Sequence, residues 1–397
     1  MGNTTTAGPL DGIKVVDMST MISGPLAGMM LADQGADVIK VESPGIGDIM
    51  RMLGSQKGGM TGIFANNNRG KRSLVVDLKN DAGADVVRRL AADADVLIQN
   101  FRPGAMDRLG LGWDELHAAN PQLIYMSISG YGPDGPASDR RAYDNVIQAA
   151  SGLAHMQGNP ATGHPELYRT LLCDKTTAYT ALQAITAALF ARATGKAEGQ
   201  HIELAMLDTA IAFLWPDGGM DAALLDDDAV RAPTLAANYA VTSLEDGFAA
   251  VSAVSDSEFS GLCAALGRPE IADDPRFANM PSRMQHIAEM GEALGIAAAA
   301  RSLADFVDGA IEHDVPASQV NSLDDLVTDP QVLNNAVFVE RQHPLAGTVR
   351  EPRPAARLSA TPQRVSDHAP GHGQHSDAIV TELGLDAAAL REAGVLF

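Results

Sequence analysis

The sequence predicts an α/β protein whose larger domain is built on a mostly parallel sheet and whose smaller domain has an α+β fold. In the first half of the chain, apolar runs of strand length alternate with helical stretches, which is typical of a parallel sheet with helices on both faces. The composition then shifts to segments rich in Gly and Asp. The length of 397 residues also exceeds one ordinary core, at roughly 150 residues per domain.

The chain opens with a βαβ pattern. Residues 12–18 (GIKVVDM) and 36–42 (ADVIKVE) are expected as buried strands, with a helix over 25–34 that has Pro25 at its first position. Further segments alternate in the same way, with strands at 73–78, 94–99 and 123–128 and helices at 81–92 and 113–119. A parallel sheet binds ligands at the carboxyl ends of its strands, so the loops after the strands are candidate sites.

A helix after Leu171-Leu172-Cys173-Asp174 organises the middle of the chain. Four apolar residues recur at helical spacing and predict one buried face: Tyr179, Leu182, Ile185 and Leu189. Gly195 can end this helix, and Asp174 is expected at its start. There the carboxylate would accept free N–H groups, and the helix dipole would keep it ionised. From these residues alone a helix cap is favoured over a reactive carboxylate, and Asp174→Asn should cost at most ~1 kcal/mol.

The second half predicts the domain boundaries. A strand at 200–205 and a helix at 207–214 precede an expected linker over 217–228, and the turn Glu245-Asp246-Gly247 predicts a hairpin. Ser255 and Glu258 form a capping box that opens a helix to Leu266. We therefore expect a large domain beginning at 1–224, a small α+β domain over 225–330, and a return segment over 331–397 with a final helix near Ala388.

The charge of the chain argues against two classes of ligand. Its 50 acidic and 29 basic residues give a net charge of −21, which repels nucleic acid and anionic membrane surfaces. No apolar run reaches the ~18 residues that a membrane span needs. An anionic ligand would therefore need a local basic pocket.

The cysteines and histidines predict neither disulfides nor a metal site. Cys173 and Cys263 cannot form a disulfide framework in a chain of this size, so we expect free thiols and a reducing, cytoplasmic location. Cys173 is expected to be a small buried residue rather than a nucleophile. His372 and His375 have no evident third ligand. Residues 1–8 lack the apolar segment of a signal peptide and are expected to be a loose tail.

Basic residues recur in loops near the predicted strands. They lie in Arg69-Gly70-Lys71-Arg72 before the third strand, in the segment 100–108 after the fourth, and at Arg140-Arg141. In an acidic protein such clustering indicates a ligand that carries phosphate. A dinucleotide is disfavoured because the first turn, residues 19–25, lacks the GxGxxG pattern, although Glu42 ends the second strand as a ribose-binding acid would.

Eight segments, in the order of a known family and running nearly end to end, carry a resemblance: PLDGIKVVDMSTMISGP, GADVIKVESPGIGD, NNNRGKRSLVVDLK, IQNFRPGAMDRLGLGW, YDNVIQAASG, ATGKAEGQHIELAMLD, DVPASQVNSLDDLVTDPQV and HPLAGTVR. On these segments the sequence resembles the family III CoA-transferases, which include formyl-CoA transferase, L-carnitine CoA-transferase and α-methylacyl-CoA racemase. The resemblance implies a Rossmann-like large domain built from both chain ends, with a small domain between them. It also implies that two ring-shaped monomers interlock as a homodimer.

The same resemblance implies the site residues. Asp174 falls at the position of the catalytic carboxylate. Seven residues fall at positions that contact CoA: Met21, Ser23, Val76, Asn100, Arg108, Arg141 and Tyr143. Arg108 and Arg141 also belong to the basic loops, so both lines of reasoning agree on them.

The implied activity is acyl-CoA:carboxylate CoA transfer. Asp174 would attack the thioester of an acyl-CoA to form a mixed anhydride, and the CoA thiolate would convert this into an aspartyl-CoA thioester. A carboxylic acid acceptor would then take the CoA. No cofactor is expected beyond the CoA thioester, which is a substrate.

Two departures from the family pattern narrow this activity. Racemase members need a His followed by an acidic residue, but the chain has Tyr143-Asp144, and Tyr with its usual pKa of about 10 is a poor base. Transfer is therefore favoured over the alternatives, an acyl-CoA racemase or epimerase and a non-catalytic CoA-binding protein. Formyl-CoA transferases carry a glycine run as a flap, and the chain has only Gly218-Gly219 near that point. This argues against the small dicarboxylate substrate of that branch.

Overall fold

The computed structural model describes residues 8–397 except 160–161, 235, 238 and 364–366. The expected tail over residues 1–8 therefore lies almost wholly outside the described residues. The chain forms two compact units, one of Met1–Val230 with Val337–Phe397 and the other of Arg231–Ala336.

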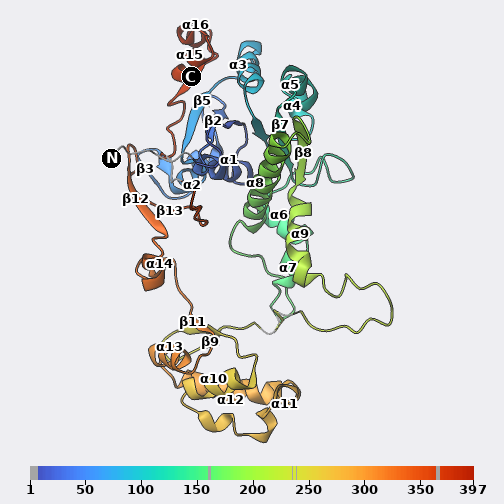
Figure 1. Ribbon diagram of the computed structural model, residues 1–397, viewed down its shortest axis with the longest axis vertical. Coiled ribbons are helices and arrows are strands. Elements are labelled where there is room, and N and C mark those ends of the chain that lie inside the picture. The colour runs from blue at the N-terminus through green and yellow to red at the C-terminus, as the bar shows by residue number, and fades with distance from the viewer. Residues whose placement is uncertain (1–7, 160–161, 235, 238, 364–366) are drawn as a thin grey trace. The chain divides into compact units, whose positions relative to one another are not determined.

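The large unit is built on a six-stranded sheet (Figure 1). Its strands are β1 (Lys14–Asp17), β2 (Asp37–Glu42), β5 (Lys71–Val75), β6 (Val96–Gln99), β7 (Ile124–Ser129) and β8 (Gln200–Ala205). They lie in the order β5-β2-β1-β6-β7-β8, and every neighbouring pair is parallel. The predicted parallel sheet is confirmed. Because the strand order reverses at β1, this strand and β6 flank the switch point where such sheets bind ligands.

Alternate residues of each strand enter two separate cores, as the period of two requires. In β1, Val15 packs into one core and Val16 into the other. The first core is covered by α1 (Ser23–Asp33), α6 (Asp144–Ala150), α7 (Leu153–Met156), α8 (Leu172–Ala193) and α9 (Met206–Gly218). The second is covered by α3 (Asp81–Ala92), α4 (Ala105–Arg108), α5 (Trp113–Ala119), α15 (Ser376–Glu382) and α16 (Ala387–Glu392). The predicted helical cover on both faces is confirmed.

The C-terminal segment returns to the large unit. Leu396 is buried in the second core and forms a β-bridge with Val76, just beyond β5. Smaller elements complete the unit: η1 (Ile49–Arg51), β3 (Gln56–Lys57), β4 (Met60–Thr61), α2 (Gly62–Asn68), β12 (Phe338–His343) and β13 (Gly347–Pro352). The final helix expected near Ala388 is confirmed as α16.

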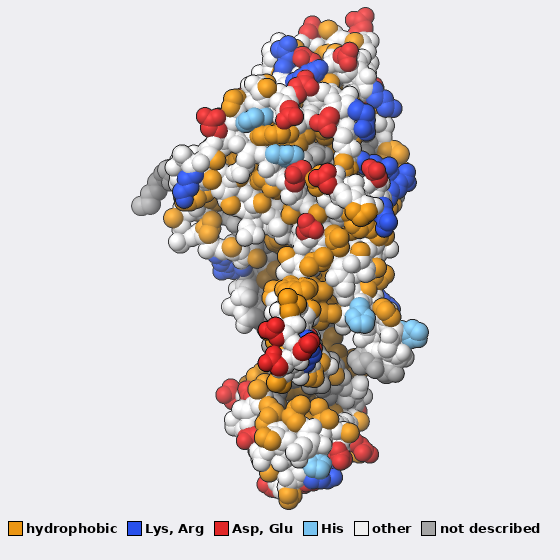
Figure 2. All heavy atoms as spheres, turned by 90° about the vertical axis from the view of Figure 1, so that its right-hand side faces the viewer, with side chains coloured by type: hydrophobic (Ala, Val, Ile, Leu, Met, Phe, Trp, Pro, Cys, Tyr) orange, Lys and Arg blue, Asp and Glu red, His pale blue; other side chains and the backbone are white. Residues whose placement is uncertain are grey.

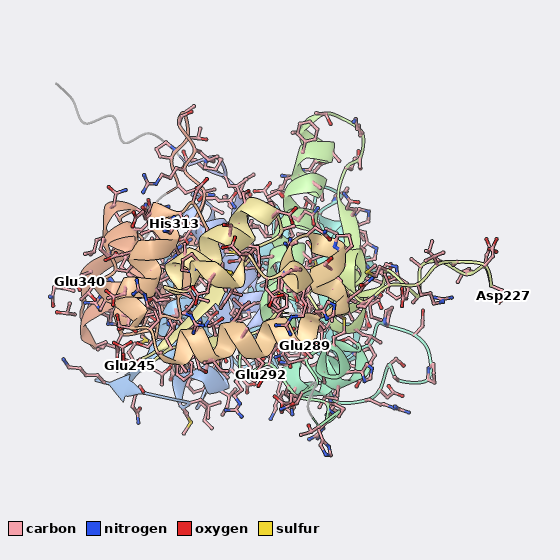
Figure 3. All side chains as sticks on the ribbon, turned by 90° about the horizontal axis from the view of Figure 1, so that it is seen from below. Asp227, Glu245, Glu289, Glu292, His313 and Glu340 are labelled. Atoms are coloured by element: carbon pink, nitrogen blue, oxygen red, sulfur yellow. The ribbon has the colours of Figure 1, made fainter. Side chains whose placement is uncertain are left out.

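The small unit combines a short antiparallel sheet with helices. The sheet pairs β10 (Phe248–Val251) with β9 (Thr242–Ser243) and β11 (Ala317–Gln319), so the hairpin at Glu245-Asp246-Gly247 is confirmed. The other elements are α10 (Asp256–Ala265), η2 (Pro269–Ile271), η3 (Pro275–Phe277), α11 (Met280–Gln285), α12 (Ile287–Ala299), α13 (Leu303–Glu312), η4 (Asp325–Val327) and α14 (Pro330–Asn334). The capping box of Ser255 and Glu258 is present at α10. The acidic side chains labelled in Figure 3 are all exposed.

Three helix predictions were wrong in detail. The helix α1 begins at Ser23, so Pro25 is not its first residue. The helix α9 continues through Pro216 to Gly218, into the expected linker. In α8, Tyr179 is 61% exposed, whereas Ile185 and Leu189 are buried together with small residues that the apolar pattern missed. No helix within the described part of the chain is long and apolar enough to cross a membrane.

Candidate active site

The largest of the three cavities described below lies at the switch point of the sheet. The loops that follow β1, β6 and β7 line it together with the start of α8, and its volume is about 760 Å³. The lining residues are Thr20, Met21, Ser23, Asn100, Phe101, Arg102, Pro103, Arg108, Ile128, Ser129, Gly130, Ser138, Asp139, Arg140, Arg141, Ala142, Tyr143, Asp174 and Met206. We call this hollow the switch-point cavity. Thus the structure brings together Asp174 and six of the seven residues expected to contact CoA.

Val76 is the predicted residue that the cavity does not include. Its side chain is fully buried in the core beneath α3 and α15, and its backbone pairs with Leu396. The Val76 side chain therefore cannot reach a ligand in the switch-point cavity without leaving the core.

Four arginines give the switch-point cavity its charge. Arg102, Arg108, Arg140 and Arg141 are all exposed, and none has an ion-pair partner among the described residues. In a chain of net charge −21, four uncompensated guanidinium groups around one cavity form the local basic pocket that an anionic ligand requires.

The basic segment at the start of β5, residues 69–72, does not belong to this pocket, contrary to the sequence interpretation. It lies at the amino end of the strand, and its residues form ion pairs inside the protein. Arg69 contacts Asp33 at 2.6 Å, Lys71 contacts Asp17 at 2.7 Å, and Arg72 bridges two other carboxylates. The pattern of basic residues in the sequence could not separate paired from free cations.

Glu42 is likewise engaged within the protein. Its carboxylate contacts Arg51 at 2.6 Å and accepts a hydrogen bond from Ser73. Although burial opposes ionisation, the hydrogen bonds and charge of Arg51 lower the pKa of Glu42 to about 2. Glu42 is therefore a structural anion in this arrangement.

Asp174 lies in the first turn of α8, but its carboxylate does not cap the helix as expected. The N-cap residue of this helix is Leu171, whose side chain makes no cap hydrogen bond. Instead, the hydroxyl of Ser23 donates to Asp174 Oδ1 at 2.9 Å, and the Ser23 backbone also hydrogen-bonds the carboxylate. The carboxylate is therefore bonded to the first residue of α1 and lines the cavity.

Burial changes the acidity of Asp174. The residue is 8% exposed. Desolvation raises its pKa from 3.8 to about 6, and the charge of Asp144 acts in the same direction, while the Ser23 hydrogen bonds partly oppose both. Asp174 is therefore a weaker acid than its position at a helix start suggested, because desolvation is the largest effect, although a carboxyl with a pKa of about 6 is still mostly ionised at pH 7.

Asp144 supplies the cap that Asp174 was expected to provide. Its Oδ2 accepts the backbone N–H of Asp174 at 2.9 Å, and its Oδ1 accepts the Gln148 amide at 2.5 Å. Gln148 also contacts the carbonyl oxygens of Tyr168 and Thr170 in the segment that leads into α8. The sequence placed Asp144 next to a site residue but gave no sign that it contacts α8, because the two are 30 residues apart.

Two predicted residues have specific roles in the cavity wall. The Asn100 side chain joins two loops, because its Oδ1 accepts the Thr20 N–H at 2.9 Å and its Nδ2 donates to the Thr20 carbonyl at 2.8 Å. Tyr143 is 59% exposed and immediately precedes α6.

Cys173, beside Asp174, is fully buried, and desolvation with two nearby carboxylates raises its pKa to about 12. Its thiol is therefore a poor nucleophile.

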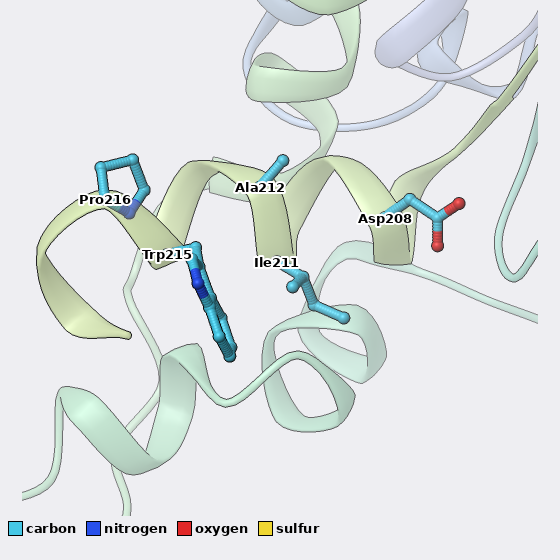
Figure 4. A pocket seen from close by; sticks show the side chains of 5 residues that line it. All are labelled: Asp208, Ile211, Ala212, Trp215 and Pro216. Atoms are coloured by element: carbon cyan, nitrogen blue, oxygen red, sulfur yellow. The ribbon is translucent and has the colours of Figure 1, made fainter. Parts of the chain in front are cut away.

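Two other hollows have a different character. One, of about 170 Å³, shares a wall with the switch-point cavity and encloses a hydrogen-bonded chain of Gln99, Ser127 and His201. The other, of about 520 Å³, follows one face of α9 and is lined by Ile211, Trp215 and their neighbours, with Asp208 as its one charged residue (Figure 4). The side of the large unit that carries α9 exposes many hydrophobic side chains (Figure 2). Of the four unpaired arginines, only Arg102 lines the smaller hollow, and none lines the hollow beside α9.

Comparison with known proteins relates this site to a family. A family model described as CoA-transferase family III matches residues 10–376. The succinate–glutarate CoA-transferase of Agrobacterium fabrum is 35% identical over 385 residues, which cover 94% of this chain and 96% of that protein. The acetyl-CoA:oxalate CoA-transferase of Acetobacter aceti is 35% identical over 350 residues, covering 86% and 88%. A crystal structure of a CAIB/BAIF family protein from Brucella suis has a TM-score of 0.85 and 34% identity, covering 95% of this chain and 100% of that chain.

Proposed function

The chain belongs to CoA-transferase family III and is a CoA-transferase, and we propose that it moves CoA from an acyl-CoA to a carboxylic acid through Asp174. One observation carries the proposal. A buried carboxylate with a raised pKa and two hydrogen bonds from Ser23 lies in a cavity with four unpaired arginines. We further expect, by family resemblance, that the active form is an interlocked homodimer in the cytoplasm.

The arginines account for CoA binding in this proposal. The phosphate groups of CoA carry several negative charges, and guanidinium groups bind phosphate through paired hydrogen bonds. Arg108 and Arg141 are the two that family resemblance also implicates. Arg102 and Arg140 add positive charge at the same cavity, so the phosphates would meet a complementary field in an otherwise acidic molecule.

The raised pKa of Asp174 suits a nucleophile. At neutral pH a carboxyl with a pKa of about 6 is still mostly ionised, yet it is more basic, and therefore more nucleophilic, than one at 3.8. One carboxylate oxygen attacks the thioester carbonyl, the C–S bond breaks, and the electron pair leaves with the CoA thiolate. The product is a mixed anhydride between Asp174 and the acyl group.

The remaining steps return the enzyme to its starting form. The thiolate attacks the Asp174 carbonyl of the anhydride, releasing the donor acid as a carboxylate and leaving an aspartyl-CoA thioester. An acceptor carboxylate then attacks this thioester, expels the thiolate and forms a second anhydride. The thiolate attacks the acceptor carbonyl, which gives the new acyl-CoA and frees Asp174. The Ser23 hydrogen bonds lie where negative charge develops on the Asp174 oxygen during the thiolate and carboxylate attacks.

The acceptor is proposed to be a carboxylic acid, with glutarate, succinate and oxalate as the first to test. These acids appear in the names of the similar enzymes from Agrobacterium fabrum and Acetobacter aceti. The absent glycine run argues against the smallest of these acids. Racemisation is disfavoured because no histidine is among the described residues that line the cavity, so the histidine base of the racemase members has no counterpart there.

Two measurements test the proposal. Incubation with an acyl-CoA and a labelled carboxylic acid should give the labelled acyl-CoA, whereas α-deuterium exchange without transfer would indicate a racemase. Binding without turnover would indicate a non-catalytic CoA-binding protein. With acyl-CoA alone the enzyme should gain the mass of CoA, and hydroxylamine should convert the modified carboxylate to a hydroxamate on the peptide that contains Asp174.

Asp174→Asn is the decisive variant, and Asp139→Asn is its matched control in the same cavity wall. An amide cannot form the anhydride, so transfer by Asp174→Asn should fall by several orders of magnitude, about 10³-fold or more. Asp139→Asn should leave CoA loading on Asp174 in place. Normal transfer by a verified Asp174→Asn protein would refute the nucleophile.

A further inference from the structure

The loop between β1 and α1 runs along the cavity in a strained conformation. Met21 has a φ of 70°, in the left-handed region that costs a residue with a Cβ about 1–2 kcal/mol. Only two other non-glycine residues within the described chain, Asp314 and Ala336, have positive φ. Such strain persists only where the surroundings hold it. Two residues after Met21, the Ser23 hydroxyl donates to Asp174.

A buried ion pair holds this loop from beneath. Lys40 of β2 and Asp48 are both fully buried, with Lys40 Nζ 3.0 Å from Asp48 Oδ2. Lys40 Nζ also donates to the Ser19 carbonyl at 2.9 Å, and Asp48 Oδ1 accepts the Met21 N–H at 3.2 Å. The two members of one ion pair therefore hold the loop on either side of Thr20.

Other contacts fix Thr20, which lies between these two points, and Ser19, at the start of the loop. Asn100 forms two hydrogen bonds with the Thr20 backbone, and Asp17 accepts the Ser19 N–H at 3.0 Å. Three consecutive residues, 19 to 21, are thus each held by a side chain from elsewhere in the unit. The strained Met21 is the point at which these constraints converge.

Stability alone does not explain a lysine and an aspartate at full burial. Replacing a buried ion pair by neutral residues of similar size is often neutral or stabilising, because the charges lose their hydration. The neighbouring charged groups, Asp17 and Glu42, have their own partners in Lys71 and Arg51. Asp48 also accepts the Met50 N–H at 3.0 Å at the start of η1. The other hydrogen bonds of the two side chains go to the loop, at Ser19 and Met21.

We propose that Lys40 and Asp48 are positioning residues for Asp174, which hold Met21 in its strained conformation and so keep the Ser23 hydrogen-bond donors on the Asp174 carboxylate. Neither residue lines the switch-point cavity. The kinetic consequence depends on the proposed role of Asp174 as nucleophile. The geometric consequence does not, because it concerns only the hydrogen bonds that the carboxylate receives.

The variant Lys40→Met/Asp48→Asn tests this by removing both charges while keeping the side-chain lengths. Loss of the Ser23 donors should raise the pKa of Asp174 by about one, since these bonds favour the ionised form. The kcat should fall at least ~10-fold, with the KM for acyl-CoA changed less than ~2-fold, because the cavity arginines stay in place. The pKa is measured by carbon NMR of protein labelled at aspartate carboxyls, with the Asp174 signal assigned by its loss in Asp174→Asn.

Two further variants separate positioning from general damage. Asp33 and Arg69 form a buried pair at the other end of α1, with both side chains 4% exposed, so Arg69→Met/Asp33→Asn should leave the pKa of Asp174 unchanged. Met21→Gly removes the Cβ that makes the conformation costly. In that background the loss of kcat caused by Lys40→Met/Asp48→Asn should shrink, for example from ~10-fold to ~3-fold.

A folded Lys40→Met/Asp48→Asn protein with an unchanged Asp174 pKa and kcat would overturn the proposal, and so would an equal pKa change in the Asp33 and Arg69 control. Should the neutral pair fail to fold, Asp48→Glu keeps the charge but moves the acceptor by one methylene, and the same direction of pKa change is required. Failure of the proposed function would give a different result in the hydroxamate experiment. The hydroxamate would then map to another residue, while the NMR result would still decide whether Lys40 and Asp48 position the Asp174 carboxylate.

Discussion

Replacing the proposed nucleophile should stabilise the folded protein at neutral pH. The pKa of Asp174 rises from 3.8 to about 6 on folding, chiefly because burial disfavours the charged form. A carboxyl with a raised folded pKa adds nothing to the free energy of unfolding below its unfolded pKa and lowers it above that point. A difference of about two in pKa corresponds to about 3 kcal/mol. Asp174→Asn removes this penalty and keeps one oxygen to accept the Ser23 hydroxyl.

The pH dependence makes this prediction specific. The stability gained by Asp174→Asn should be near zero at about pH 4, grow as the pH rises to about 6, and stay constant above that value. Urea unfolding of both proteins at matched concentration, at pH 4, 5, 6 and 7.5, measures the difference in midpoint. The cap interpretation predicts a loss of at most ~1 kcal/mol instead. An Asn variant that is less stable at pH 7.5, or a difference that does not vary with pH, would refute the reasoning from burial.

Three other results are expected. We expect the KM for acyl-CoA to rise about 10-fold in Arg108→Ala and in Arg141→Ala, and by less at high salt. The control Arg89→Ala removes an exposed arginine on α3 and should not change this KM. An unchanged KM in both cavity variants would show that these arginines do not bind CoA. The single-turnover rate of CoA loading should rise with pH through about 6 as Asp174 ionises, and a flat profile from pH 5 to 8 would contradict the raised pKa. Dilution to nanomolar concentration should not release folded, active monomer if two chains interlock, and sedimentation with an activity assay would detect one.

The sequence predicted the parallel sheet because strand patterns are local. Runs such as KVVD and DVIKVE carry the burial pattern of central strands in the letters themselves, and both form strands within the predicted ranges. The basic pocket at the carboxyl ends of the strands also followed from the sequence, since the loops at Arg108 and Arg141 come after successive strands. These features depend on neighbouring residues and on topology, which the order of elements largely determines.

What the sequence could not predict depends on contacts between distant residues. Arg69 and Arg108 are alike in sequence, yet one is buried against Asp33 and the other is exposed beside a cavity. Asp174 was expected to cap α8 because a capping preference is local, but the cap comes from Asp144 and the raised pKa comes from burial. The sequence did not indicate the ion pair of Lys40, because no local pattern links a lysine in a hydrophobic strand to a partner 8 residues away at Asp48.

Under the proposed role of Asp174 as nucleophile, Asp144 would serve both the fold and the reaction. A neutral residue there would spare the protein a second buried carboxylate beside Asp174, but a side chain without an acceptor would leave the Asp174 N–H unbonded at the start of α8. The charge of Asp144 also makes Asp174 more basic. With a pKa of about 6, about nine-tenths of Asp174 is ionised at pH 7, so the gain in nucleophilicity costs little of the reactive form. A higher pKa would reduce the ionised fraction of Asp174 at neutral pH, and a lower pKa would make its carboxylate a weaker nucleophile. We therefore infer that Asp144, which raises this pKa, and Ser23, which lowers it, act in opposition to keep Asp174 reactive at neutral pH.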